Sequence, residues 1–239
     1  MNFALLLAYD GAAFRGWQKQ PGMVTVQGAL EDALRAHLGK RLVVHGASRT
    51  DAGVHAEGQV ANFRTDLLHP PSPEKEKKFF FLGAADPPAL PGLHVLKWAV
   101  ADESFDARSS AIGKKYRYRL PAFVAKGDWE RARAALRGLE GLPELSGLAS
   151  PSKDHKPAPP LTSWWLDTEG TLLVEGRAFR KHQIRNLAGH LGAIALGYAT
   201  PESLRELAQR KRPWMGATAP AHGLTLLEVL YPRELDPFR

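Results

Sequence analysis

The stretch "RLVVHGASRTDAGVHAEGQVANFRT" (residues 41–65) indicates the fold, because two apolar runs flank a short polar segment that contains glycine. Residues 41–47 and 58–65 have the apolar and β-branched composition of strands. Between them, Arg49 and Asp51 precede Gly53, which permits a tight turn. The pattern predicts two strands, with an arginine and an aspartate where the chain turns.

Alternating strands and helices extend from this stretch in both directions. Residues 3–9 predict a buried strand, and the apolar spacing from Thr25 to Leu38, followed by Gly39, predicts a helix. The remaining predicted elements are a helix at 71–83, strands at 93–101 and 112–120, a helix at 128–139, a hairpin of 161–167 and 171–179, helices at 181–197 and about 201–210, and a strand at 223–231. The order β-α-β-β-α-β therefore occurs twice, which is the order of a ferredoxin-like fold. We expect an α+β protein with a mainly antiparallel sheet, whose two ferredoxin-like halves are residues 1–107 and 108–239.

The composition favours a polyanionic partner. The 239 residues include 32 Lys and Arg against 25 Asp and Glu, which gives a net charge of +7 and favours nucleic acid, although a generic basic surface is the alternative. The absence of cysteine excludes disulfides and thiol nucleophiles and fits a cytoplasmic location. No apolar run approaches the roughly 20 residues that cross a bilayer, so we expect no membrane association.

Asp51 is the candidate nucleophile. In a strand, the two-residue spacing would put Arg49 and Asp51 on one face, where the guanidinium would favour the ionised carboxylate. A nucleophilic carboxylate needs such support. A purely structural Arg–Asp ion pair, or an aspartate that caps the turn, would give the same spacing.

The segment "FRKHQIRNLAGHLGAI" (179–194) is a second candidate site. Gly189 and Gly192 follow Arg185 at helical spacing and form a glycine track beside it. This track would allow another backbone or a buried acid to come close. Lys181 and His182 lie in the expected first turn, where positive charge opposes the helix dipole unless a phosphate or carboxylate binds there. A solvated basic turn is the alternative.

Aromatic and basic residues alternate in two further segments. In "GKKYRYRL" (113–120), Tyr116 could stack on a base or pack in the core of a sheet. Arg15 and Trp17, on a glycine-rich loop, could contact RNA backbone or a base. No phosphate-binding loop, dinucleotide fingerprint or H-E-x-x-H zinc motif occurs, so we expect neither cofactor nor metal.

Five blocks resemble the TruA family of tRNA pseudouridine synthases, in family order and over nearly the whole chain. They are "YDGAAFRGWQKQPGMVTVQGALEDAL", "SRTDAGVHAEGQVANF", "SFDARSSAIGKKYRYRL", "FRKHQIRNLAGHLGAI" and "APAHGLTLLEVLYP". The resemblance implies the pseudouridine synthase fold, with a cleft between its two halves. It also implies a cofactor-free homodimer that isomerises uridines 38, 39 and 40 in the anticodon stem-loop of tRNA.

The resemblance also implies roles for individual residues. Asp51 matches the nucleophile, Arg49 an arginine that helps to extrude the base, and Arg185 the partner of the aspartate. Tyr116 matches a ring that stacks on the uracil and accepts its proton, and Leu224 an apolar residue near the site. Two other classes stay open on the residues alone. One is a non-catalytic RNA-binding protein, and the other is an aspartate-dependent hydrolase, which would usually need a metal ion.

Overall fold

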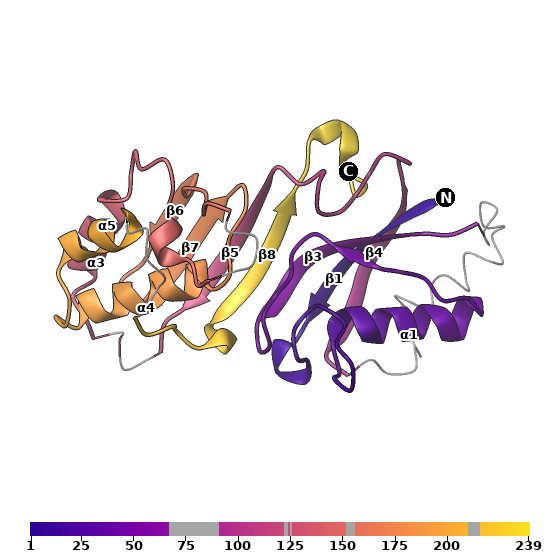
Figure 1. Ribbon diagram of the computed structural model, residues 1–239, viewed down its shortest axis with the longest axis horizontal. Helices are drawn as coiled ribbons and strands as arrows, with labels where there is room; N and C mark the ends of the chain where they lie inside the picture. The colour runs from indigo at the N-terminus through magenta and orange to yellow at the C-terminus, as the bar shows by residue number, and fades with distance from the viewer. Residues whose placement is uncertain (67–90, 122–123, 125, 152–155, 210–215) are drawn as a thin grey trace. The chain divides into compact units, whose positions relative to one another are not determined.

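The computed structural model describes residues 1–66, 91–121, 124, 126–151, 156–209 and 216–239 (Figure 1). The predicted helix at 71–83 lies outside these residues. Of the described helices, none is long and apolar enough to cross a membrane.

The chain divides into two compact units, and their bounds differ from the predicted halves. The first unit contains residues 1–112 together with 226–239, and the second contains residues 113–225. The C-terminal residues belong to the first unit because they bond to it. The amide of Ile112 donates to the carbonyl of Leu230 at 2.8 Å, and the Tyr231 hydroxyl donates to the carbonyl of Ala107 at 2.6 Å.

Mainly antiparallel strands form the sheet of the first unit. They are β1 (Asn2–Tyr9), β2 (His45–Gly46), β3 (His55–Arg64), β4 (Leu93–Ala101) and β8 (Leu224–Leu230), whose first two residues fall in the second unit. β1 lies between β4 and β3, with Phe3 opposite Phe63 and Val100, and β8 follows β3 in the strand order. The predicted strand at 41–47 is reduced to two residues, because only these pair with β3.

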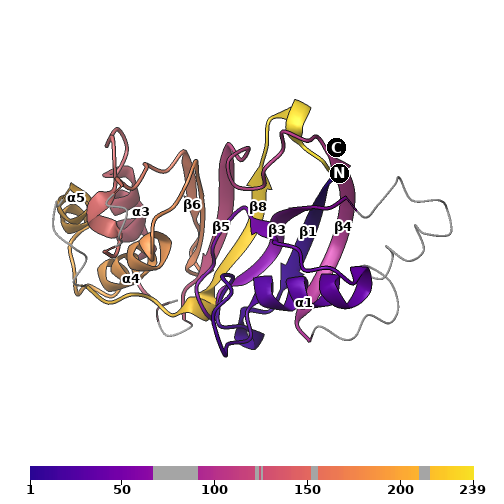
Figure 2. The same ribbon diagram turned by 45° about the vertical axis from the view of Figure 1, so that its right-hand side comes forward.

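Helix α1 (Val26–Leu38) covers this sheet, as Figures 1 and 2 show. Its predicted ends are confirmed. The Thr25 side chain accepts from the amide of Gly28 at 3.2 Å, and Gly39 ends the helix with a φ of 70°. Val26, Leu30 and Leu34 are buried at helical spacing, and each such side chain stabilises the fold by roughly 1.5–3 kcal/mol.

The second unit also combines strands and helices. Its elements are β5 (Gly113–Arg119), α3 (Trp129–Arg137), β6 (Ser163–Leu166), β7 (Thr171–Gly176), α4 (Gln183–Ala195) and α5 (Pro201–Gln209). β7 pairs antiparallel with β5 and β6, and Gly170, with a φ of 83°, lies in the turn between β6 and β7. The three helices lie together beside these strands (Figure 1). The predicted α+β class and element order are therefore confirmed for the described residues.

Candidate active site

Asp51 lies on a tight turn between β2 and β3. The amide of Val54 donates to the carbonyl of Asp51 at 3.1 Å, and Gly53 has a φ of 82°, as a glycine at the third position of a turn can. Thr50 and Val54 are buried, whereas Asp51 is half-buried. The turn therefore has buried supports on both sides of the candidate nucleophile.

The N-terminal loop between β1 and α1 packs against this turn. The amide of Trp17 donates to the carbonyl of Thr50 at 3.0 Å. A Cβ on Gly16 would lie 2.8 Å from that carbonyl oxygen, and a Cβ on Gly11 would lie 2.3 Å from the carbonyl oxygen of Val54. The close approach of the two loops therefore requires glycine at both positions.

A buried chain of polar side chains ends at the residue before Asp51. The Tyr9 hydroxyl and Thr50 Oγ1 are 2.8 Å apart, and Gln59 Nε2 donates to the Tyr9 hydroxyl at 3.3 Å. The Gln59 amide group also accepts from the amide of Ser48 at 3.2 Å and donates to its carbonyl at 2.7 Å. Burial raises the pKa of Tyr9 to about 12, despite its hydrogen bonds to Thr50 and Gln59, so the phenol stays protonated at neutral pH.

Arg49 and Arg15 are exposed on the same unit, and neither lies in a strand. The expectation that Arg49 and Asp51 share one face of a strand is wrong, because both belong to the loop between β2 and β3. Arg15 lies in the loop before α1. The Arg15 amide donates to the carbonyl of Val24 in the same loop at 2.8 Å.

Trp17 packs inside the unit rather than facing solvent. The residue is 2% exposed, and a Cβ on Gly46 would lie 2.3 Å from two of its ring atoms. This burial leaves no ring face on which a base could stack. We therefore assign Trp17 a packing role in place of the predicted RNA contact.

Arg185 in the second unit is held by the segment before β8. Its Nε donates to the carbonyl of Ala219 at 2.8 Å, and the amide of Ala219 donates to the carbonyl of Arg185 at 3.1 Å. A Cβ on Gly189 would lie 2.5 Å from the carbonyl oxygen of Ala217. The glycine track beside Arg185 thus admits another backbone, as one of the two sequence alternatives predicts.

The predicted basic turn at the start of α4 has an unusual backbone. The helix begins at Gln183 rather than at 181, because His182 caps it in the left-handed region with a φ of 60°. The His182 ring places Nδ1 3.0 Å from Ser150 Oγ, and the amide of Ser150 donates to the carbonyl of Lys181 at 2.9 Å. The Lys181 side chain is exposed.

The tyrosines of β5 and Leu224 face the interior. Tyr116 is 5% exposed and meets Phe179 edge to face, with ring centroids 5.2 Å apart. Tyr118 donates to the carbonyl of Pro220 at 2.9 Å, and its pKa is raised to about 12 by burial, although the charge of Arg185 opposes this shift. The alternating burial along β5 therefore supports core packing for these rings.

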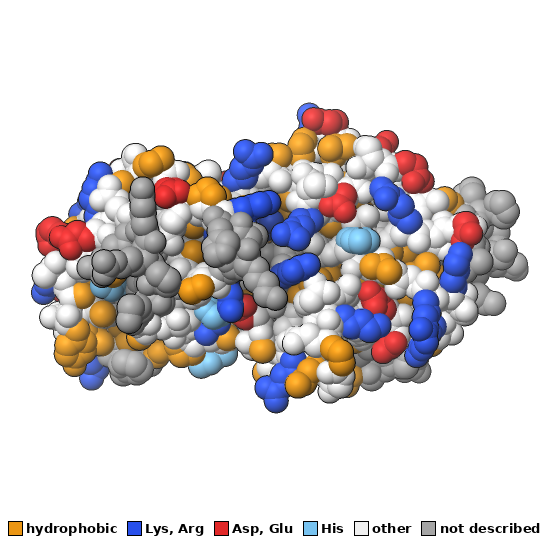
Figure 3. All heavy atoms as spheres, in the orientation of Figure 1, with side chains coloured by type: hydrophobic (Ala, Val, Ile, Leu, Met, Phe, Trp, Pro, Cys, Tyr) orange, Lys and Arg blue, Asp and Glu red, His pale blue; other side chains and the backbone are white. Residues whose placement is uncertain are grey.

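The acidic and basic side chains around α1 are mixed, as Figure 3 shows. Lys19 forms an ion pair with Glu31 at 2.8 Å, and Arg35 with Asp32 at 3.5 Å. This helix therefore contributes little to the net positive charge of the chain.

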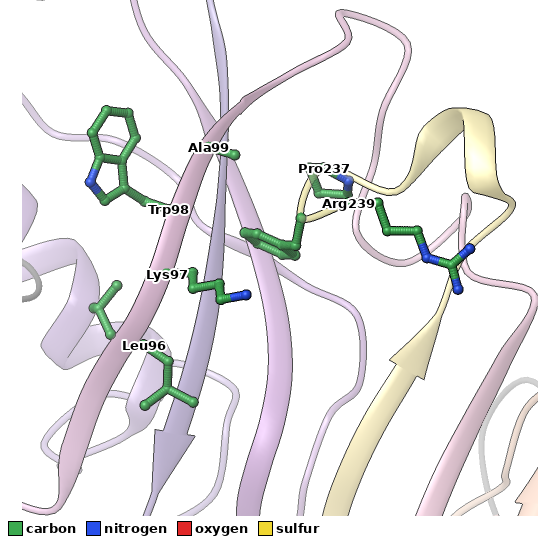
Figure 4. Close-up of a pocket in the computed structure, with 8 residues that line it drawn as sticks. Leu96, Lys97, Trp98, Ala99, Pro237 and Arg239 are labelled. Carbon is green, nitrogen blue, oxygen red and sulfur yellow. The ribbon is translucent and has the colours of Figure 1, made fainter.

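A surface pocket in the first unit lies away from the Asp51 loop. It is lined by residues of β4 and the C-terminus, and Lys97 and Ala99 point to its side of the strand whereas Trp98 points to the other (Figure 4). Among the described residues, no group of three or more His, Cys, Asp or Glu side chains could hold a metal ion.

Comparison with known proteins first identifies the class to which this protein belongs. Residues 148–232 match the family described as tRNA pseudouridine synthase. Proteins named tRNA pseudouridine synthase A are similar over nearly the whole chain. The Thermosipho africanus protein is 35% identical over 248 residues, with 96% of this chain and 99% of the relative covered. The Myxococcus xanthus protein is 37% identical over 262 residues, with 98% and 93% covered.

This similarity is sufficient to assign the chain to a particular family: it belongs to the TruA family of tRNA pseudouridine synthases. The resemblance seen in the sequence blocks is thereby confirmed. Tyr9, Thr50 and Gln59 were not predicted as site residues from the sequence. The only available signal was polar residues in otherwise apolar strands, which does not identify their partners.

Proposed function

We propose that this chain isomerises uridine to pseudouridine in the anticodon stem-loop of tRNA, at positions 38, 39 and 40, with Asp51 as the nucleophile. The observation that carries the proposal is the turn that holds Asp51 half-exposed between the buried residues Thr50 and Val54. Family membership over 96% of the chain supports the substrate class. A preorganised carboxylate is what an attack on a positioned nucleotide requires.

The reaction exchanges one bond for another within the nucleotide. The target base first leaves its stack, at a cost of about a few kcal/mol that binding contacts offset. The Asp51 carboxylate then attacks either carbon 6 of the uracil or carbon 1′ of the ribose, and the bond from nitrogen 1 to carbon 1′ breaks. After the base rotates, carbon 5 bonds to carbon 1′ and the carboxylate is released. Carbon 5 loses its proton and nitrogen 1 takes up a proton, so that the hydrogen count is unchanged. Product and substrate have the same mass, and no cofactor takes part.

Three residues assist this step in the proposal. Arg185 is the proposed partner of the Asp51 carboxylate, as the family resemblance implies, and its Nε donates to the carbonyl of Ala219 at 2.8 Å. Tyr116 is the proposed ring that holds the detached uracil and accepts the carbon-5 proton. Because this ring is 5% exposed and packs against Phe179, the uracil can reach it only if the packing around it opens when tRNA binds. Arg49, exposed two residues before Asp51, occupies the place that the base leaves.

The remaining proposed contacts concern tRNA binding. Arg15 and Lys181 are exposed cations that bind phosphate, and His182 lies beside Lys181 at the start of α4. Leu224 is the proposed apolar contact of the uracil, as the family resemblance implies, and its buried side chain must become accessible when tRNA binds. The active form is a cytoplasmic homodimer, as the family resemblance implies.

The test maps pseudouridine in a tRNA transcript by chemical labelling after incubation with the purified protein. We expect modification within positions 38–40 by the wild type and none by Asp51→Asn. The exposed residue Asp32 supplies the matched control, and Asp32→Asn should retain full activity. Tyr116→Phe separates the ring from the hydroxyl, because stacking survives in this variant and proton acceptance does not.

Each rival class predicts a different result in the same assay. A wild-type protein that binds tRNA but forms no pseudouridine would support the RNA-binding class. Loss of modification after treatment with a chelator would support a metal-dependent enzyme. Modification by Asp51→Asn at the wild-type rate would exclude Asp51 as the nucleophile.

A further inference from the structure

We infer that Tyr9 and Gln59 are positioning residues that act through Thr50 to hold Asp51 in its reactive place. The inference rests on the proposed function of Asp51. It assigns a catalytic consequence to buried residues that do not touch the substrate.

The connection runs from the sheet to the turn through side chains alone. Tyr9 ends β1 and Gln59 lies in β3, two strands that are paired along their length. The Tyr9 hydroxyl meets Thr50 Oγ1 at 2.8 Å, and Gln59 binds the Tyr9 hydroxyl at 3.3 Å. A rigid two-strand base is therefore linked by hydrogen bonds to the residue that precedes Asp51.

Gln59 also fixes the chain on the other side of Arg49. Its side-chain amide contacts both the amide and the carbonyl of Ser48, at 3.2 Å and 2.7 Å. The hydrogen-bonded side chains of Tyr9 and Gln59 therefore hold both Thr50 and Ser48. The backbone amide of Trp17 also donates to the carbonyl of Thr50 at 3.0 Å. The position of the Asp51 backbone is set by contacts from three separate segments.

The burial of these polar groups indicates that the network fixes one geometry of the turn rather than adding much to the free energy of unfolding. Tyr9, Thr50 and Gln59 are 4%, 7% and 0% exposed. A net hydrogen bond adds only about 0.5–1.5 kcal/mol, and apolar residues of the same shape can be equally stable. A fully satisfied polar network instead defines one geometry, because leaving any member without its partner is unfavourable. Such a network supports a reacting group that must be held within about half an ångström of its productive place.

The test compares substitutions that remove one hydroxyl each. Thr50→Val and Tyr9→Phe each remove the hydrogen bond between the side chains of residues 9 and 50, whereas Thr50→Ser keeps a hydroxyl at position 50. Tyr231→Phe is the matched control, since its buried hydroxyl donates to Ala107 at 2.6 Å and belongs to the same unit but not to the Asp51 turn. Single-turnover tritium release from tRNA labelled at carbon 5 of uridine measures the chemical step, and the affinity for tRNA is measured separately.

We expect Thr50→Val and Tyr9→Phe to slow tritium release about 10- to 100-fold, since small displacements of a reacting group have effects of this size. The affinity for tRNA should change less than about twofold, and Thr50→Ser should restore most of the rate. Tyr231→Phe should lose stability to a similar extent as Tyr9→Phe and keep the wild-type rate.

Two outcomes would overturn the inference. One is a rate for Tyr9→Phe and Thr50→Val equal to that of Tyr231→Phe, and the other is a rate loss explained wholly by weaker tRNA binding. Asp51→Asn, assayed in parallel, separates this failure from that of the proposed function. If Asp51→Asn is inactive, the nucleophile assignment stands without the network, and if it is fully active, the assignment itself fails. Should Thr50→Val not fold, Tyr9→Phe with its control decides the question alone.

Discussion

Gly16→Ala changes the support of the Asp51 turn by a single methyl group. Gly16 has a φ of 90°, in the left-handed region that an alanine tolerates poorly. The added Cβ would lie 2.8 Å from the carbonyl oxygen of Thr50 and 3.1 Å from the amide nitrogen of Ala52. The substitution therefore strains its own backbone and pushes directly on the residues that flank Asp51.

The structure separates these two effects. Gly22 in the same loop has a φ of 71°, but nothing lies within 4 Å of a Cβ placed there. Gly22→Ala should therefore lower the free energy of unfolding by only the backbone strain, about 1–2 kcal/mol. Gly16→Ala should lower it by a further 1–3 kcal/mol, roughly the effect of overpacking. The Thr50 oxygen must move by about half an ångström to restore ordinary contact.

The assay combines urea denaturation with single-turnover tritium release. We expect Gly22→Ala to keep the wild-type rate and Gly16→Ala to slow it at least about 10-fold, because the displaced carbonyl belongs to the residue before Asp51. Equal rates in the two variants, with Gly16→Ala folded, would refute the reasoning that the N-terminal loop positions the nucleophile.

Three further predictions concern packing, pH and salt. Trp17→Ala should lower the free energy of unfolding by about 3–5 kcal/mol in urea denaturation, and a loss of tRNA affinity without destabilisation would contradict the packing role. Because the pKa of Tyr9 is about 12 in the folded state against 10 ordinarily, the unfolded chain releases this proton first and stability falls as pH rises from 10 towards 12. Melting temperatures over that range should decline less steeply for Tyr9→Phe, and identical slopes would contradict the shift. The affinity for tRNA should fall steeply with salt, and Arg15→Ala and Lys181→Ala should each reduce the logarithmic slope by about one in anisotropy titrations, whereas an unchanged slope would exclude a phosphate contact.

Local signals in the sequence were sufficient to predict both ends of α1. Thr25 and Gly39 mark the ends of α1 because a capping hydroxyl and a left-handed glycine act within a few residues. The strand predicted at 41–47 was too long because pairing depends on a partner strand, and only His45 and Gly46 have one. The start of α4 was missed by two residues because nothing in the sequence shows that His182 adopts a φ of 60°.

The candidate site was predictable only where its residues are close in sequence. Arg49 and Asp51 stand out through their short spacing beside glycine. The hydrogen bonds of Tyr9 to Thr50 and Gln59 join residues 41 and 50 positions apart, which no local pattern reveals. Trp17 was assigned to RNA because an aromatic residue in a glycine-rich loop suggests exposure, whereas the Gly46 backbone leaves room for its ring inside the unit.

The central claim is that the Asp51 carboxylate forms a bond with the nucleotide. The most direct measurement is single-turnover tritium release from tRNA labelled at carbon 5 of uridine, with Asp51→Asn in excess over a tRNA whose binding is confirmed in the same sample. We expect wild-type affinity for tRNA and no tritium release above the enzyme-free background. Release at the wild-type rate from this variant would contradict the account.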